Sequence, residues 1–199
     1  YGNSVNTDVT PVQPVAEIHM TTSRKPEPVL LDTLKFLGQK SPALFTDNYY
    51  NIRIAEKTDN FYRRNKLQTK WLYDAEPSPL YYAVVNNLKN AEIYGLTADD
   101  YSADLIEKAV QTVYGSEVAD KEEVMALDVR ITELYFLFTT HVSEGKIRNA
   151  GYSDKLWVRQ PLSKSVADVE ALVDAKDPKD LEKIVDTIQP ATEQYKRLQ

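Results

Sequence analysis

Few residues in this sequence could do chemistry, because the chain has no cysteine and only two histidines, His19 and His141. Without cysteine there is no thiol nucleophile, no disulfide, no thiolate-bound zinc site and no iron–sulfur cluster. The histidines belong to no His-Glu-x-x-His zinc motif. His141 lies at the end of a long apolar segment, in what would be the last turn of a helix. The helix dipole favours a histidine there, and an acid–base or ligand role is the alternative interpretation. We expect no catalytic residue and no metal site.

Paired carboxylates are the remaining route to catalysis, since a glycoside hydrolase needs only two. The pair Glu122-Glu123 lies near an expected helix start, where acidic side chains are favoured. Asp128 and Glu133 instead interrupt the most apolar segment, and their spacing puts them about 140° apart around a helix. They do not predict a catalytic dyad. As polar side chains in an apolar helix, they must find partners or reach an edge of the protein.

Composition also argues against cofactors and nucleic acids as ligands. The chain has only six glycines and no glycine-rich phosphate-binding loop. Its 30 acidic and 24 basic residues give a net charge of −6, whereas nucleic-acid binders normally present a basic face. No apolar run approaches the roughly 20 residues of a membrane span. We therefore expect no cofactor, no nucleic-acid partner and no transmembrane segment.

Tyrosine is abundant, with 13 residues among the 199 of the chain. Tyrosine and tryptophan suit half-buried positions and often anchor protein interfaces. We expect most of them to pack in the core or at its rim, with stacking on a sugar ligand as the alternative. The candidates for a docking surface are Tyr49, Tyr50, Tyr82 and Trp157.

The elements that must position these residues are predicted to be helices. Serine or aspartate followed by proline marks helix starts, and glycine or proline marks helix ends. Helices are expected from Ser41-Pro42 to about Arg64, from Ser78-Pro79 to Gly95, from Ser102 to Gly115, from about 118 to 143, and from Asp177-Pro178 to Pro190. Strand signals are sparse. The prediction is a mainly α protein with a single compact helical domain over 29–199 and an extended, flexible N-terminal leader over 1–28.

The helix at about 118–143 is expected to be central and buried. Its middle, from Val124 to Phe138, is apolar on nearly every face, and such a helix usually lies inside the protein. The expected leader is polar and rich in proline, and it shows no signal segment.

Short motifs along the chain occur in an order that resembles a known family. They are Asn60–Arg64, Lys70–Leu72, Ala91–Leu96, Thr97–Tyr101, Ala126–Asp128, Ile131–Glu133, Glu144–Ile147, Trp157, Ile188–Pro190 and Tyr195–Leu198. Together they resemble the N-terminal, noncatalytic scaffold domain of large murein L,D-transpeptidases of Gram-negative bacteria. The resemblance covers about residues 30–199.

This resemblance implies a helical, noncatalytic domain that takes part in cell-wall biogenesis in the periplasm or cell envelope. In that family a separate domain carries a Ser-His-Gly-Cys nucleophile motif, and this sequence has none. The implied partners are the catalytic domain of the same polypeptide or cell-wall synthesis proteins, with peptidoglycan as a further candidate. Two alternatives remain at this point: an independent helical protein-interaction module of the envelope, and a carboxylate enzyme acting on cell-wall sugar.

Overall fold

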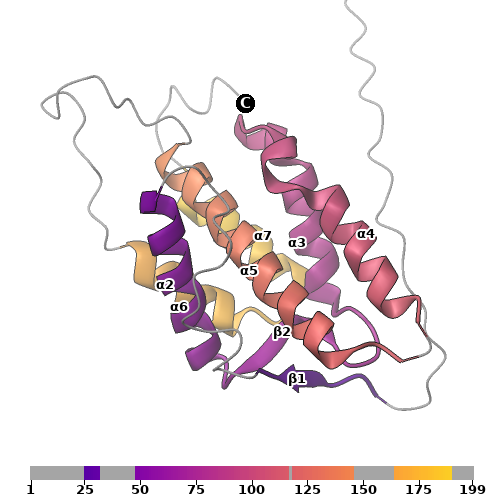
Figure 1. Ribbon diagram of the computed structural model, residues 1–199. Helices are drawn as coiled ribbons and strands as arrows, with labels where there is room; N and C mark the ends of the chain where they lie inside the picture. The colour runs from indigo at the N-terminus through magenta and orange to yellow at the C-terminus, as the bar shows by residue number, and fades with distance from the viewer. Residues whose placement is uncertain (1–24, 32–47, 117, 146–163, 190–199) are drawn as a thin grey trace, which may run out of the picture.

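The computed structural model describes residues 25–31, 48–116, 118–145 and 164–189 (Figure 1). These residues form six α-helices, two short 3-10 helices and a two-stranded sheet. In chain order they are β1 (Pro28–Leu30), α2 (Asn48–Arg64), β2 (Gln68–Tyr73), α3 (Pro79–Lys89), η1 (Ala91–Tyr94), η2 (Ala98–Tyr101), α4 (Ala103–Tyr114), α5 (Lys121–Glu144), α6 (Lys164–Asp174) and α7 (Pro178–Ile188). The expected mainly α fold is confirmed.

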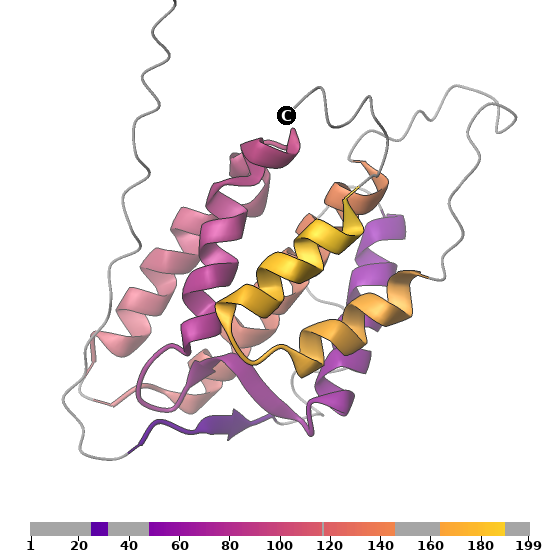
Figure 2. The ribbon, with the colours of Figure 1, turned by 180° about the vertical axis from the view of Figure 1, so that it is seen from behind.

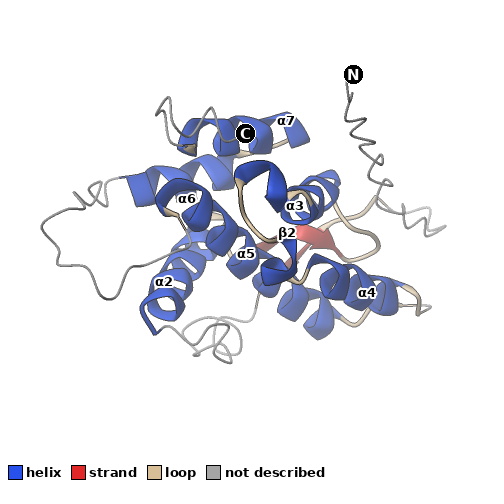
Figure 3. Ribbon diagram, turned by 90° about the horizontal axis from the view of Figure 1, so that it is seen from above, coloured by secondary structure: helices blue, strands red, loops and turns tan. Residues whose placement is uncertain are grey.

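Helix α5 is the central element. It packs against α2, α3, α4, α7 and both strands, and the view along the helices shows it between α2, α6, α3 and α4 (Figure 3). Every side chain from Ile131 to Val142 is buried. The predicted central buried helix is confirmed, with Asp120 as its N-cap residue. The Asp120 side chain accepts hydrogen bonds from the backbone N–H groups of Glu122 and Glu123.

The sequence punctuation locates most helix ends correctly. Helix α3 begins at Pro79 and α4 lies between Ser102 and Gly115. The expectation that one helix continues to Gly95 is wrong, since α3 ends at Lys89. There Asn90 donates from its backbone and its side chain to the carbonyl of Asn86, and the chain continues as the short helix η1.

The sheet is the element that the sequence signals miss. Strands β1 and β2 pair antiparallel, with Pro28 opposite Tyr73 and Leu30 opposite Gln68. The sheet lies across one end of the helices (Figures 1 and 2). No tight hairpin joins the two strands, so no local turn motif in the sequence predicts them. The chain enters β2 from α2 through Lys66 and Leu67, which both have a positive φ.

We predict that Asp177→Ala destabilises the protein by about 1 kcal/mol, because helix α7 loses its N-terminal cap. The Asp177 side chain accepts from the N–H of Asp180, whose own side chain accepts in return from the N–H of Asp177. Urea unfolding followed by circular dichroism measures the change. Glu182→Ala, at an exposed position of the same helix, is the matched control and should stay within about 0.5 kcal/mol of the parent. Equal effects for the two variants would contradict the prediction.

Candidate functional site

The centre of the protein holds a buried carboxyl group, that of Asp128 on α5, which has no exposed surface. Its Oδ2 atom accepts hydrogen bonds from the backbone N–H groups of Trp71 and Leu72, each at 2.8 Å. The N–H of Lys70 lies 3.1 Å from both carboxyl oxygens. Three consecutive amides of β2 therefore converge on one side chain of α5, which fastens the strand to the central helix.

Two hydroxyl groups complete this arrangement, which we call the Asp128 cluster: Tyr62, Trp71, Asp128 and Thr132. The Tyr62 hydroxyl on α2 lies 2.5 Å from Asp128 Oδ1 and 2.7 Å from Thr132 Oγ1. The indole N–H of Trp71 donates to Thr132 Oγ1 at 2.8 Å. All four side chains are fully buried, so the cluster joins α2, β2 and α5 by polar contacts in the middle of an apolar core.

The surroundings of the cluster shift the protonation of its members. Burial raises the pKa of Asp128 to about 6, although the Tyr62 hydroxyl and the three strand amides oppose this rise. Burial, and then the nearby Asp128 carboxylate, raises the pKa of Tyr62 well above its ordinary value. The Tyr62 hydroxyl therefore keeps its proton and is available to donate a hydrogen bond.

Aromatic rings enclose the polar cluster. The rings of Phe61 and Trp71 stack with centroids 6.1 Å apart, and the Phe61 ring meets the rings of Tyr62 and Phe136 edge-on. Offset and edge-to-face pairs of this kind add stabilisation beyond the area that they bury. The packing keeps water away from Asp128, and this exclusion is the physical cause of its raised pKa.

Lys70 connects the cluster to the C-terminal helices. Its ammonium group donates to the carbonyl oxygens of Val173 and Ala175 at 2.8 and 2.7 Å, where α6 ends. Its own carbonyl accepts from the hydroxyl of Ser78, just before α3. Burial lowers the pKa of Lys70, and nearby carboxylates partly offset this effect. One residue of β2 therefore links α3, α5 and the turn that follows α6.

The other polar residues of α5 also have partners. His141 is buried in the last turn, and its Nδ1 atom lies 3.0 Å from the Tyr101 hydroxyl. This position agrees with the interpretation of His141 as a helix-end residue. Glu133 is almost fully buried, and its carboxylate lies 3.7 Å from the guanidinium of Arg130.

The predicted docking residues are placed only in part. Tyr82 lies on α3, half-buried, with its ring edge-on to that of the buried Tyr81 at 5.1 Å. Tyr49 and Tyr50 are in the first turn of α2, and their side chains lie outside the described residues. Trp157 also lies outside the described residues. The docking surface remains a prediction.

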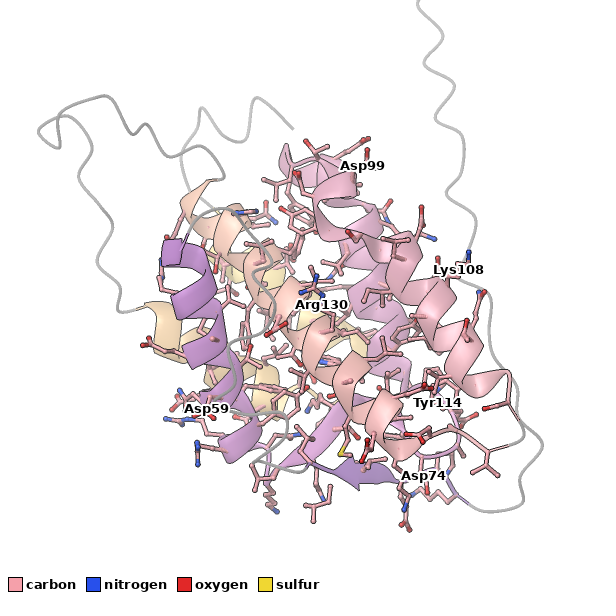
Figure 4. The ribbon with its side chains drawn as sticks, in the orientation of Figure 1. Asp59, Asp74, Asp99, Lys108, Tyr114 and Arg130 are labelled. Atoms are coloured by element: carbon pink, nitrogen blue, oxygen red, sulfur yellow. The ribbon has the colours of Figure 1, made fainter. Side chains whose placement is uncertain are left out.

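Carboxyl groups occur in several separate parts of the described structure. Asp128 and Glu133 are buried in the core, and Asp59, Asp74 and Asp99 lie far apart on the molecule (Figure 4). Within the described ranges no group of three histidine, cysteine, aspartate or glutamate residues could hold a metal ion. In the same part of the chain, none of the helices has the length and apolar character needed to cross a membrane.

The sequence identified Asp128 as needing partners but did not identify Tyr62 and Trp71 as those partners. A signal was available, because Asp128 and Thr132 are four residues apart and therefore share one face of α5. That pair predicts a polar strip on an otherwise apolar helix, and a polar strip predicts donors opposite it. It does not say which segments of the chain supply the donors.

A family model described as Scaffold domain matches residues 56–199, and this range contains every member of the Asp128 cluster. No curated protein and no solved structure matches the sequence.

We predict that Asp128→Ala destabilises the protein by about 3–5 kcal/mol, because buried strand amides and the Tyr62 hydroxyl lose their acceptor. The free energy of unfolding in urea at pH 7 measures the loss. Glu123→Ala, at an exposed position of the same helix, should change it by about 0.5 kcal/mol or less. A loss below about 1 kcal/mol for Asp128→Ala would show that the strand does not depend on this carboxyl group.

We predict that Lys70→Met destabilises the protein by about 1–2 kcal/mol, because two carbonyls at the end of α6 lose their donor. Hydrogen exchange should localise the effect to α6 and the turn before α7, where amide protection falls. Lys108→Met, on the exposed face of α4 (Figure 4), is the matched control. A uniform loss of protection over all helices would contradict the assigned role of Lys70.

Proposed function

The chain belongs to the Scaffold domain family, and from this premise we propose that it is the noncatalytic scaffold of a peptidoglycan L,D-transpeptidase. In this proposal it supports a separate catalytic domain in the periplasm or cell envelope of a Gram-negative bacterium. The work of such a domain is mechanical: it offers a rigid surface that holds or orients a catalytic partner.

One observation carries this proposal. Three motifs of the transpeptidase-like order, Asn60–Arg64, Lys70–Leu72 and Ala126–Asp128, are distant in the sequence but meet in the Asp128 cluster. The motifs therefore correspond to one packed core rather than to unrelated matches along the chain. This meeting supports the view that the resemblance reflects a common fold. The transpeptidase context is the proposal that we base on that common fold.

The chemistry of the chain supports a division of labour. The transpeptidase reaction of the resembled family uses a thiolate nucleophile, and this chain has no cysteine. The buried carboxyl group of Asp128 accepts hydrogen bonds from the strand amides of β2. The proposal therefore places the nucleophile in another domain and gives this chain a supporting role.

The first test is the complete reading frame that encodes the chain. We predict that it also encodes a Ser-His-Gly-Cys motif in a separate domain. A complete frame without this motif would overturn the transpeptidase proposal and leave an independent interaction module of the envelope as the function.

The second test uses the full-length protein and the one placed docking residue. We predict that Tyr82→Ala lowers the rate of peptidoglycan cross-linking several-fold in a protein that remains folded by circular dichroism. Leu105→Ala, which removes an exposed apolar side chain on α4, is the control and should keep the parent rate. Equal rates for the parent and both variants would exclude the Tyr82 surface from docking.

Peptidoglycan itself is the other candidate partner. Binding of muropeptides to the isolated chain, measured by calorimetry, separates the two roles. We expect no measurable binding, because a supporting domain contacts protein. Saturable binding would assign the recognition of peptidoglycan to this chain.

A further inference from the structure

The two oxygens of the Asp128 carboxyl group have different surroundings. Oδ2 faces the strand and accepts from the amides of Trp71 and Leu72. Oδ1 lies 3.1 Å from the N–H of Lys70, as Oδ2 does. It also faces the hydroxyl of Tyr62, an atom that can either donate or accept a hydrogen bond. A proton on Oδ1 would therefore have an acceptor in place, and Oδ2 would remain a carbonyl oxygen for the strand.

Beyond Tyr62 the hydrogen bonds continue through a second reversible group. Tyr62 Oη and Thr132 Oγ1 are 2.7 Å apart, and either atom can be the donor. Thr132 Oγ1 also lies 3.0 Å from the backbone carbonyl of Asp128, which can accept its proton. If Asp128 is ionised, Tyr62 donates to it. If Asp128 is protonated, it donates to Tyr62, Tyr62 donates to Thr132, and Thr132 donates to the carbonyl.

We propose that the Asp128 cluster is a buried proton-binding site, which takes up one proton at Asp128 Oδ1 and reverses the Tyr62–Thr132 hydrogen bond without moving heavy atoms. The inference concerns a response of the fold to pH and does not depend on the proposed transpeptidase context. Each donor keeps an acceptor in both states, so the site accommodates either form of the carboxyl group.

Titratable groups from the neighbouring elements act on the site. They are Tyr62 on α2, Lys70 and Tyr73 on β2, Tyr114 on α4 and Glu133 on α5. The only cation among them, Lys70, directs its ammonium group to carbonyl oxygens at the end of α6. The carboxyl group is therefore buried with hydrogen-bond donors but without a contacting cation, and burial disfavours its charged form.

The direction of the pH response follows from linkage. The pKa of Asp128 in the folded protein is about 6, above the value of 3.8 for a free side chain. The folded protein therefore holds the proton more tightly than the unfolded chain does. The stabilisation from this proton is complete below pH 3.8 and is lost as the pH rises to about 6. For this group alone, the unfolding equilibrium constant rises about 100-fold over that interval.

The experiment is an NMR titration of the full chain between pH 4 and 8. We expect the side-chain carboxyl carbon of Asp128 to titrate with a midpoint near 6. The indole N–H of Trp71 should follow the same midpoint, because it donates to Thr132, whose hydroxyl reverses. A midpoint below about 4.5, or an indole signal that does not respond, would overturn the proposal.

Two variants separate this site from other acids. Asp128→Asn carries a side-chain N–H where the protonated acid has O–H, so it should fold and abolish the indole transition. Relative to this variant, the unfolding equilibrium constant of the parent should rise about 100-fold between pH 4 and 7. Glu133→Gln, the matched control on the same helix, should retain the transition. A transition that persists in Asp128→Asn or disappears in Glu133→Gln would refute the assignment, and if Asp128→Asn fails to fold, the titration of the parent chain decides.

Discussion

The fold depends on how the backbone amides of β2 are satisfied inside the protein. A buried N–H group without an acceptor costs free energy comparable to a lost hydrogen bond. Three consecutive amides of β2 solve this problem with one side chain, Asp128 of the central helix. The strand then carries the remaining connections, since its residues pair with β1 and reach α3 and the end of α6.

This solution has a cost as well as a benefit. Removing a carboxylate from water is unfavourable, and the raised pKa of Asp128 expresses that penalty. In return, the directional hydrogen bonds from Tyr62, Trp71 and the strand are satisfied together only when α2, β2 and α5 occupy one relative position. An apolar contact of the same size would allow the strand to slide along the helix, because dispersion and hydrophobic forces have little direction. The polar cluster therefore fixes the relative positions of α2, β2 and α5 in a core that is otherwise aromatic and aliphatic.

A rigid, well-defined core suits the role of a scaffold. The chain belongs to the Scaffold domain family, and in our proposal it supports chemistry that a separate domain performs. The polar residues of α5 that interrupt its apolar sequence make contacts within the fold. Asp128 binds a strand, Glu133 pairs with Arg130, and His141 contacts Tyr101 near the end of the helix. In the proposed function, the molecule therefore acts through its shape and its surface.

The sequence by itself determined the features that depend on neighbouring residues. The cap at Asp177, the start of α3 at Pro79 and the buried character of α5 follow from local hydrogen bonds and from helical periodicity. The exclusion of thiol chemistry follows from composition. Only the tertiary structure decided the sheet and the partners of Asp128, because Trp71 is 57 residues away in the sequence and Tyr62 is 66. Local patterns show that a buried carboxyl group needs donors, but the packing of α2 and β2 against α5 determines which donors reach it.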